Sequence, residues 1–451
     1  MSILMKIYNS SPIFMQNIFT TMQGIKYKHE RFGSVYWNTL NSLKQRDYSD
    51  EKALKDYQNM RLRELIKYAK KHSPFYRKFY KDIDLSKINT VDDIGHLPIL
   101  PKETVRQNLD EMYAVSPDEG IASNTSGTTG TTLKFYYTKK DRQRRMAYLD
   151  FFKYQHGFVA IKMRRASFNS SKIVPPKQMS KVFWRDNLAI KQRIYSGYHC
   201  KGDNLKYYVE NLNKFKPESL DGYPSAMYEL ARYIIDNNIT LSFTPIAIFP
   251  TAETLLPHYK KAIEKAFRCP VRDQYASSEG APFITECKCG KLHYCIDTGV
   301  IEFADDGEMT VTCFETHGTP LVRYRIGDRA FLSENQECGC GCKMPIVDRI
   351  EGRTLDYIQT KSNGKMTSIY LSLVSSGFDN SVKAMQFIQN DLDSVDIYLV
   401  TDNKYKREMD QIILDKLNYN LGPDMDYRIH LVDELHKDPS GKCRLIINKT
   451  I

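Results

Sequence analysis

The sequence predicts an α/β protein of more than one domain, with a large N-terminal domain of mixed α/β sheets that includes a β-rich part, and a small α+β C-terminal module. Three observations support this prediction. A chain of 451 residues is too long for one compact core. Apolar β-type segments alternate with helical ones between residues 166 and 275. Strand-like alternation then returns between Ile296 and Leu332.

Residues 1–115 predict a mostly helical start, because apolar residues recur at helical spacing between Leu54 and Ile66. Pro98 and Pro101 predict an extended link that follows it. Helices are then predicted near Arg142–His156, Leu205–Phe215, Ser225–Asn237 and Leu255–Phe267. Strands are predicted at Ala166–Phe168, Ile246–Pro250 and Val271–Tyr275. This alternation favours a largely parallel sheet.

Asp305-Asp306-Gly307-Glu308 is a hairpin-turn signal between two strand-like segments, Val300–Phe303 and Met309–Phe314. We therefore expect a smaller β-rich part within residues 285–345. From residue 353 the chain indicates a compact α+β module, which could move as a lid. The predicted domains are residues 1–352 and 353–451.

The composition is that of a globular protein, with 41% hydrophobic and 26% charged residues and a mean hydropathy of −0.49. No apolar run approaches the ~20 residues that span a bilayer. The apolar start, Met1 to Met22, is interrupted by Lys6 and several polar residues, and it lacks the pattern of a signal peptide. We expect it to be a helix that packs on the body or lies on a surface, and we expect a cytoplasmic protein without a transmembrane span.

The formal net charge of +11 could indicate nucleic acid or an anionic membrane as a partner. However, basic and acidic residues are interspersed, and no nucleic-acid-binding motif is present, so no nucleic-acid partner is expected. One local basic cluster is simply explained as a solvated helix face, although a positive field that attracts ATP is the alternative. It contains Lys139, Lys140, Arg142, Arg144 and Arg145.

The most informative segment is residues 123–134, SNTSGTTGTTLK. Six hydroxyl side chains and two glycines lie between Thr125 and Lys134. Many donors with one ammonium group suit a polyphosphate, whose oxygens only accept hydrogen bonds. No Gly-Lys-Ser/Thr triplet follows the glycines, so this is not a Walker loop. A polar surface loop is the alternative for this segment taken alone.

Four further blocks follow in a fixed order: Tyr275-Ala276-Ser277-Ser278-Glu279-Gly280, Tyr324-Arg325-Ile326-Gly327-Asp328, Asp348-Arg349-Ile350-Glu351-Gly352-Arg353 and Pro439-Ser440-Gly441-Lys442. With the polar loop, they resemble the conserved blocks of adenylate-forming enzymes, the superfamily of acyl-CoA synthetases, adenylation domains and luciferases. Five blocks in the right order are strong evidence, whereas any one alone would be weak.

Other segments resemble the phenylacetate–CoA ligase and capsular-polysaccharide (CapK-type) branch of that superfamily. They are Ser73-Pro74-Phe75-Tyr76, Leu97-Pro98-Ile99-Leu100-Pro101-Lys102, Gly222-Tyr223-Pro224-Ser225 and Ala252-Glu253-Thr254-Leu255. The resemblance covers nearly all of the chain from about residue 50 onward. It implies that residues 1–352 are an adenylation domain and that the C-terminal module is its lid.

The resemblance also implies a nucleotide-binding set. The polar loop would hold the β- and γ-phosphates of ATP through Ser126, Gly127, Thr128, Thr129, Gly130 and Lys134. Tyr275 would stack on adenine, and Ala276, Ser277 and Ser278 would face the nucleotide. Asp328 would bind the ribose hydroxyls, and Arg353 would reach ribose or phosphate. Taken alone, Tyr275 would more commonly pack in a core, and Asp328 could belong to a turn.

The resemblance assigns catalytic roles to Glu279, Lys442 and Lys134. Glu279 would hold Mg²⁺, a hard cation that prefers oxygen ligands. Lys442 would bridge the incoming carboxylate and the α-phosphate, and Lys134 would contact the phosphates. A surface glutamate and a solvated Ser-Gly-Lys turn are the alternatives. Leu355 stands where many relatives place Asp or Lys at the hinge, so the hinge residue stays open.

The acyl pocket is expected around two segments, Tyr223-Pro224-Ser225 and residues 249–252. An apolar pocket wall there weakly favours an aromatic or otherwise apolar acid as the substrate. The pocket candidates are Tyr223, Pro224, Ser225, Phe249, Thr251 and Ala252.

Seven of the ten cysteines lie between Cys287 and Cys342, and five of them form two clusters about fifty residues apart: Cys287 with Cys289, and Cys338 with Cys340 and Cys342. Paired Cys/His clusters in a cytosolic chain predict a structural Zn²⁺ site rather than disulfides. Some members of the CapK-type branch carry a similar zinc. The predicted ligands are Cys287, His293, Cys338 and Cys340, with Cys289 and Cys342 as alternates, and reduced thiols without metal are the alternative.

The sequence thus predicts an enzyme that uses ATP and Mg²⁺ to activate a small carboxylic acid as an acyl-adenylate. The acyl group would then pass to CoA or to an amine on a sugar or amino acid, in surface-polysaccharide or secondary-metabolite biosynthesis. A non-catalytic nucleotide-binding relative and a zinc-stapled scaffold for polysaccharide or membrane machinery are the alternatives. The non-catalytic relative is disfavoured because Lys134, Glu279, Asp328, Arg353 and Lys442 are all present, and ATP binding and turnover would discriminate the scaffold.

Overall fold

A computed structural model describes residues 3–124, 133–169, 173–175, 180–200, 202–253, 255, 257–351, 357–362, 364–367, 371, 381–401, 403–436 and 446–450. The chain divides into two compact units, one formed by Met1–Ser123 with Phe135–Arg353 and the other by Asn124–Lys134 with Thr354–Ile451. The predicted domain boundary at residue 352 stays a prediction, because residues 352–356 lie outside the described part of the chain.

The first unit begins with a series of helices. They are α1 (Ile3–Ser10), α2 (Ile13–Arg31), α3 (Ser34–Gln45), α4 (Glu51–His72), α5 (Pro74–Phe79) and α6 (Lys102–Met112), with short 3₁₀ turns at Leu85–Lys87 and Val91–His96. In α4, Leu54, Leu62 and Leu65 recur at helical spacing and are buried. The carboxylate of Asp50 caps this helix by accepting a hydrogen bond from the Ala53 amide at 2.9 Å.

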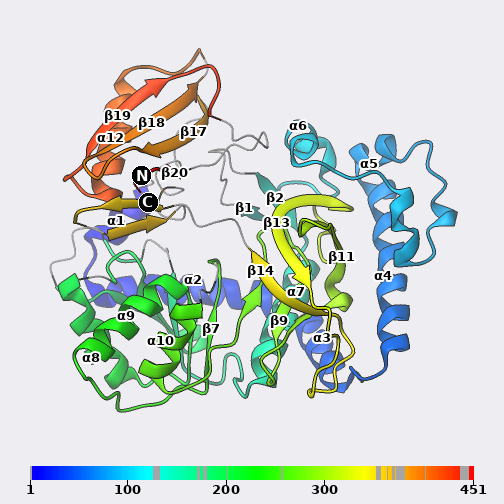
Figure 1. Cartoon of the computed structure of the whole chain (residues 1–451), viewed down its shortest axis with the longest axis horizontal. Helices are drawn as coiled ribbons and strands as arrows, with labels where there is room; N and C mark the ends of the chain where they lie inside the picture. Colours follow the sequence, from blue (N-terminus) through cyan, green and yellow to red (C-terminus); the bar gives the residue numbers. More distant parts are fainter. Residues whose placement is uncertain are drawn as a thin grey trace. The chain divides into compact units, whose positions relative to one another are not determined.

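The predicted α/β class is confirmed by a five-stranded sheet in the order β4-β5-β3-β6-β7. Its strands are β3 (Arg165–Asn169), β4 (Trp184–Asn187), β5 (Gln192–Ser196), β6 (Ser219–Gly222) and β7 (Ala247–Pro250). All pairs are parallel except the edge pair β4–β5. The helices α8 (Leu205–Phe215), α9 (Pro224–Asp236) and α10 (Pro257–Phe267) lie beside this sheet (Figure 1). The parallel strands therefore end at one common edge, where α/β proteins usually bind ligands.

A second sheet of seven antiparallel strands has the order β11-β12-β13-β14-β10-β9-β8. Its strands are β8 (Gln274–Tyr275), β9 (Ile284–Glu286), β10 (Leu292–Tyr294), β11 (Gly299–Phe303), β12 (Glu308–Cys313), β13 (Tyr324–Leu332) and β14 (Ile346–Glu351). Elsewhere in the unit, short 3₁₀ turns are formed by Leu188–Ile190, Gly202–Asn204 and Ile296–Thr298. The predicted hairpin is the β11–β12 pair, whose turn closes with a hydrogen bond from the Gly307 amide to the Ala304 carbonyl at 2.8 Å.

The single strand predicted at Val271–Tyr275 is wrong in detail, because the segment crosses from one sheet to the other. Val271 forms an isolated bridge with Ile248 of the parallel sheet. Only Gln274 and Tyr275 form β8, which pairs with β9. Between them, the Asp273 carbonyl accepts a hydrogen bond from the Glu286 amide at 2.9 Å. The segment that leads into Tyr275 is thus fixed to both sheets.

β1 (Ile121–Asn124) and β2 (Lys134–Tyr137) pair on either side of the predicted phosphate loop. The helix α7 (Lys139–Gln155) follows β2 directly. Its start is fixed by a capping box, in which Thr138 and Asp141 bond each other's backbone amides.

The second unit is an α+β module. Its four-stranded sheet has the order β19-β18-β17-β20, and a separate hairpin is formed by β15 and β16. The elements are β15 (Tyr357–Thr360), β16 (Gly364–Thr367), β17 (Val382–Gln389), β18 (Ser394–Thr401), α12 (Glu408–Leu421), β19 (Asp426–Leu431) and β20 (Ile446–Asn448). Buried side chains of α12, among them Ile413 and Leu417, share one core with Phe387 and Ile397 of the sheet. Among the described helices of both units, none has the length and apolar character needed to cross a membrane.

Candidate active site

Tyr275 and Asp328, which come from two different predicted nucleotide-binding blocks, lie in hydrogen-bonding contact. The Tyr275 hydroxyl donates to Oδ2 of Asp328 at 2.8 Å. Tyr275 lies on β8 and Asp328 on β13, so the bond spans strands that are not neighbours in the sheet. The pairing of β13 with β12 shifts register between Arg325 and Arg329, which places a bulge beside Asp328. The fold thus brings a ring and a carboxylate together at one place.

The loop that carries Glu279 is held from two sides. The carbonyl of Ser278 accepts hydrogen bonds from the Tyr137 hydroxyl at 2.7 Å and from Ser123 Oγ at 3.3 Å. Gly280 has a φ of +93°, and a Cβ there would lie 2.5 Å from Cγ2 of Thr316, so a larger residue does not fit. Glu279 itself is only 5% exposed. Its position is therefore set by the packing of the loop.

Arg145 of α7 binds the same loop through backbone carbonyls. Its guanidinium donates to the Gly280 carbonyl at 2.7 Å and to the Ser277 carbonyl at 3.4 Å. Arg145 is 8% exposed, so its interpretation as part of a solvated helix face is wrong. The sequence pattern did not distinguish it from its neighbours, because an arginine that binds backbone carbonyls of a distant loop leaves no local signal.

Burial and the nearby charge of Glu279 affect Tyr137. Burial is the main reason why the pKa of the Tyr137 hydroxyl rises to about 12, and the Glu279 carboxylate adds to this effect while Arg145 opposes it. The hydroxyl therefore stays protonated and can donate its hydrogen bond to Ser278 at any physiological pH.

Several predicted site residues lie outside the described part of the chain. They are Ser126, Gly127, Thr128, Thr129, Gly130, Arg353 and Lys442. Lys134 is described, and it begins β2 as an exposed residue. Ala276 packs with Phe283, Tyr148 and Leu43 as a partly buried side chain.

Most of the predicted acyl-pocket residues gather where β6 and β7 end. The Tyr223 amide donates to the Phe168 carbonyl at 3.0 Å, and the Thr251 amide donates to the Gly222 carbonyl at 2.9 Å. Gly222 has a φ of +126°, and a Cβ would lie 1.8 Å from the Phe168 carbonyl oxygen, which explains the glycine. Pro224 follows as the first residue of α9, and Ala252, with a φ of +70°, follows Thr251. The side chain of Ser225 is not among those described.

Phe249 does not join this group at the strand ends. Its side chain is fully buried in a cluster with Phe152, Phe158 and Ala247. The described structure also buries a histidine three residues after β5. His199 is 7% exposed, and its Nδ1 lies 2.8 Å from Oγ of Ser196 while its ring stacks on Phe183.

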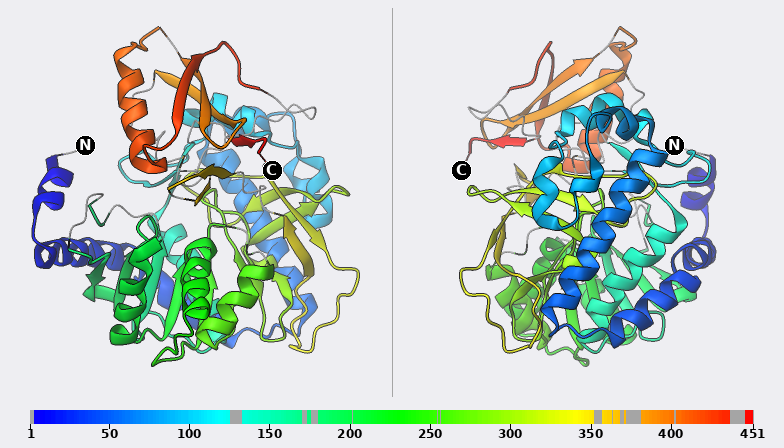
Figure 2. Two further views of the ribbon diagram at one scale, coloured as in Figure 1. Left: turned by 60° about the vertical axis from the view of Figure 1, so that its left-hand side comes forward. Right: turned by 90° about the vertical axis from the view of Figure 1, so that its right-hand side faces the viewer.

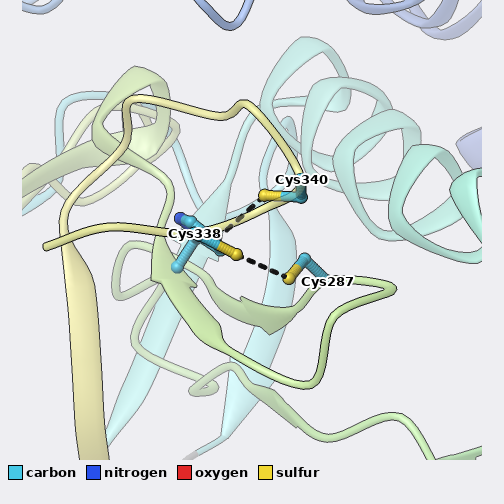
Figure 3. Close-up of side chains that lie close together, drawn as sticks. Cys287, Cys338 and Cys340 are labelled. Atoms are coloured by element: carbon cyan, nitrogen blue, oxygen red, sulfur yellow. Dashed lines mark hydrogen bonds between the residues drawn. The ribbon is translucent and has the colours of Figure 1, made fainter.

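The four predicted zinc ligands come together in space. One ligand atom from each of Cys287, His293, Cys338 and Cys340 lies within 4.8 Å of the others. The Sγ atoms of Cys287 and Cys338 are 3.6 Å apart, with Cys340 beside them (Figure 3). Sγ of Cys340 lies 3.4 Å from Nε2 of His293. Nδ1 of His293 lies 3.0 Å from the Met344 carbonyl, so this nitrogen carries the proton and Nε2 is left toward the thiols.

Both cysteine turns are built alike. The Gly290 amide donates to the Cys287 carbonyl at 3.0 Å, and the Gly341 amide donates to the Cys338 carbonyl at 3.2 Å. Both glycines have a positive φ, +81° and +79°, which a Cys-x-Cys-Gly turn accommodates without strain. Two such turns that face one another across β10 and β14 present their sulfur atoms to a common point.

The hydrogen bonds in this cluster favour a thiolate. Burial raises the pKa of the Cys338 thiol, but hydrogen bonds, above all the one from the Cys340 backbone amide, outweigh it and lower the pKa to about 6. The donor set of three sulfurs and one imidazole nitrogen fits the preferences of Zn²⁺.

Comparison with known proteins agrees with this architecture. Residues 358–449 match the family model of the CapK C-terminal domain. The chain is 43% identical over 451 residues to Protein CapK of Staphylococcus aureus, with 98% of each chain covered. It is 24% identical over 265 residues to the indoleacetate–lysine synthetase of Pseudomonas savastanoi, covering 57% of this chain and 65% of that one.

Among solved structures, the chain is similar to 2-hydroxyisobutyryl-CoA ligase in a postadenylation state in complex with R3-HIB-AMP. The TM-score is 0.56 at 16% identity, and the match covers 89% of this chain and 91% of that one. This likeness shows the fold of the adenylate-forming ligases. The 43% identity to Protein CapK over 98% of both chains shows that the chain belongs to the CapK family.

Proposed function

We propose that this chain activates a carboxylic acid with ATP and then transfers the acyl group to CoA or to an amine. The observation that carries the proposal is the hydrogen bond between Tyr275 and Asp328, with the buried Glu279 on the loop that follows Tyr275. It unites an aromatic ring, a carboxylate suited to a vicinal diol and a carboxylate suited to a divalent cation within one unit. A protein surface that does not bind a nucleotide has no evident need for these three groups together.

In the proposed reaction, a carboxylate oxygen of the acid attacks the α-phosphorus of ATP. The bond from that phosphorus to the bridging oxygen breaks, pyrophosphate leaves, and an acyl-adenylate forms. A thiol or amine then attacks the acyl carbon and releases AMP. Negative charge builds up on the phosphates in the first step, so fixed cations and donors must stabilise it.

We assign the residues of the chain to these tasks. Asp328 binds the ribose hydroxyls, Tyr275 packs on adenine, and Lys442 stabilises charge between the carboxylate and the α-phosphate. Glu279 would hold Mg²⁺, which supplies charge neutralisation on the phosphates when bound. The remaining phosphate contacts come from Ser126, Gly127, Thr128, Thr129, Gly130, Lys134 and Arg353.

The acid is expected to lie at the ends of β6 and β7, beside Tyr223, Thr251 and Ala252. The acceptor is either CoA or an amine. The name of one relative, an indoleacetate–lysine synthetase, favours an amine, and the name of the similar solved ligase favours CoA. The resemblance of the sequence to the capsular-polysaccharide (CapK-type) branch supports a setting in surface-polysaccharide biosynthesis.

We further propose that Cys287, His293, Cys338 and Cys340 hold a structural Zn²⁺. Four donors of the right type converge, and the hydrogen bond from His293 to the Met344 carbonyl fixes the ring so that Nε2 faces the site. A closed site with four protein ligands stabilises the β-rich sheet and leaves no open position for catalysis.

The test is pyrophosphate release from ATP and Mg²⁺ across aromatic acids, aliphatic acids and amino acids, with hydroxylamine as a generic acceptor. Release and hydroxamate formation with one acid, both lost in Asp328→Ala, would support the proposal. ATP binding without release across the whole panel would favour the non-catalytic alternative. CoA and amines compared on the active acid then identify the acceptor.

A further inference from the structure

Helix α2 carries a row of large apolar side chains that face outward. Phe14, Ile18, Met22 and Ile25 are 64%, 47%, 60% and 47% exposed. Their spacing of four, four and three residues places them on one face of the helix. We call these four residues the α2 stripe.

The opposite face of α2 is firmly attached to the edge strand of the parallel sheet. The Asp186 amide donates to Oδ1 of Asn17 at 3.0 Å, and Thr21 Oγ1 donates to the Asp186 carbonyl at 3.2 Å. Gly24 is buried against Asn187, whose Oδ1 would lie 1.9 Å from an added Cβ. Figure 2 shows the blue N-terminal helices at the outer side of this sheet. These contacts fix the rotation of α2, so the stripe faces away from the sheet.

The stripe extends onto the neighbouring turn. Leu188 is 74% exposed, and its amide donates to Thr21 Oγ1 at 3.2 Å, which places it beside α2. Lys191, an exposed residue, follows three positions later at the end of the same 3₁₀ turn. The apolar surface thus has contributions from two elements that are fixed to one another.

The charges around the stripe are mostly positive, and Glu30 in the last turn is the one acidic residue of α2. Residues 1–29 contain no Asp or Glu, whereas Lys6, Lys26 and Lys28 are present and exposed. Asp186, on the adjoining strand, is paired with Arg193 at 2.6 Å. An apolar helix face flanked mainly by basic residues matches the pattern of helices that lie in a membrane interface.

We propose that the α2 stripe docks the protein on the surface of an anionic phospholipid bilayer, with Lys26 and Lys28 in contact with the headgroups. A second copy of the chain fits less well, because two stripes in contact would bring lysine-rich segments together, and each α2 has Glu30 as its one acidic residue while the nearby Asp186 already pairs with Arg193. Lipid headgroups supply the complementary charge, and the bilayer boundary accepts the apolar side chains.

The experiment is flotation of the full-length protein with vesicles of phosphatidylcholine containing 30% phosphatidylglycerol, and with pure phosphatidylcholine vesicles as the neutral comparison. The stripe variant is I18Q/M22Q. The matched control, L392Q/I412Q, removes two apolar side chains that are 53% and 51% exposed elsewhere. A charge variant, K26Q/K28Q, tests the headgroup contact. Thermal melting checks that each variant is folded.

We expect binding to the anionic vesicles, at least ~10-fold weaker binding by the stripe variant, and wild-type binding by the matched control. The charge variant should lose roughly fivefold per lysine, and neutral vesicles should bind weakly. Absence of wild-type binding to anionic vesicles, or equal binding by the stripe variant, would overturn the proposal. So would a dimer in solution that I18Q/M22Q converts to a monomer without vesicles, because a second copy would then occupy the stripe.

Discussion

Tyr275 donates a 2.8 Å hydrogen bond to Asp328, and this bond joins two sequence blocks that are 53 residues apart. The two side chains reach one another across the antiparallel sheet, because β8 follows a segment anchored to both sheets and β13 bulges beside Asp328. The carboxylate is thus oriented before any nucleotide arrives. Such preorganisation lowers the entropic cost of binding.

Loss of the Asp328 carboxylate, or of the Tyr275 hydroxyl that orients it, should weaken nucleotide binding. In Asp328→Ala, we expect ATP affinity to fall by at least ~10-fold, because a charged hydrogen-bond acceptor is lost. Tyr275→Phe keeps the ring and should cost about threefold to tenfold. Calorimetric titration with ATP measures both, and Tyr27→Phe on the exposed surface is the control. Unchanged affinity in Asp328→Ala would argue against ribose binding.

Lys442 should separate binding from chemistry. Because its proposed role is to stabilise charge in the transition state, Lys442→Ala should reduce pyrophosphate release by at least ~100-fold and leave ATP affinity within about twofold. Lys449→Ala, an exposed lysine in the same C-terminal segment, is the matched control and should behave as wild type. An equal loss of binding and turnover would contradict the assigned role.

Arg145 should act as a positioning residue for the Glu279 loop. Its loss leaves the Gly280 and Ser277 carbonyls without their charged donor, so Arg145→Met should lower the free energy of unfolding by about 2 kcal/mol. It should also lower kcat more than ATP affinity, because Glu279 is displaced. Lys140→Ala, exposed on the same helix, is the control. Denaturant melts and the kcat-against-KM split measure these effects, and a change in stability with unaltered kinetics would leave Arg145 with a structural role alone.

Metal removal should destabilise the β-rich sheet. We expect about one zinc ion per chain by elemental analysis and a marked fall in melting temperature after verified chelation. His293→Ala and Cys338→Ser should each lose the metal. Cys289→Ser and Cys342→Ser test the alternate ligands, and retention of zinc in both would leave the four proposed ligands in place. Protein purified without metal, with a melting curve that chelators do not alter, would contradict the site.

Asp273 should make stability depend on pH. Burial, and secondarily the charge of Glu286, raise the pKa of the Asp273 carboxyl from 3.8 to about 6. A raised pKa in the folded state contributes stability that is present below about pH 4 and is lost as the pH rises through 6. Asn cannot ionise and can still accept the hydrogen bond from the Gln274 amide.

Asp273→Asn should therefore stabilise the protein at pH 8 by about 2 kcal/mol and have little effect at pH 4. Urea melts at both pH values measure the difference, with exposed Asp118→Asn as the control. If the stabilisation by Asp273→Asn instead grew as the pH falls, its sign would be the opposite of the expected one and would contradict the effect of burial on the Asp273 pKa.

The fold class could be predicted because its signals are local. Apolar spacing marked α4 and α8, and the Asp-Asp-Gly-Glu turn marked the β11–β12 hairpin, since both depend on neighbours within a few residues. The segment at Val271–Tyr275 could not be divided correctly in this way. Its first half bonds to β7 and its second half to β9, and sheet membership depends on partners far along the chain.

By itself, the sequence determined which residue types could do the chemistry: the polar loop with Lys134, the carboxylates Glu279 and Asp328, and the cysteine pairs. Only the tertiary structure decided how they are held. Arg145 binds the Glu279 loop from a helix more than 130 residues earlier, and His293 turns toward the thiols because the Met344 carbonyl holds its other nitrogen. Similarly, Phe249 enters the core while α2 leaves four apolar side chains in solvent. Composition and spacing fix what a side chain can bind, but its partners and its exposure depend on which distant surfaces the folded chain brings against it.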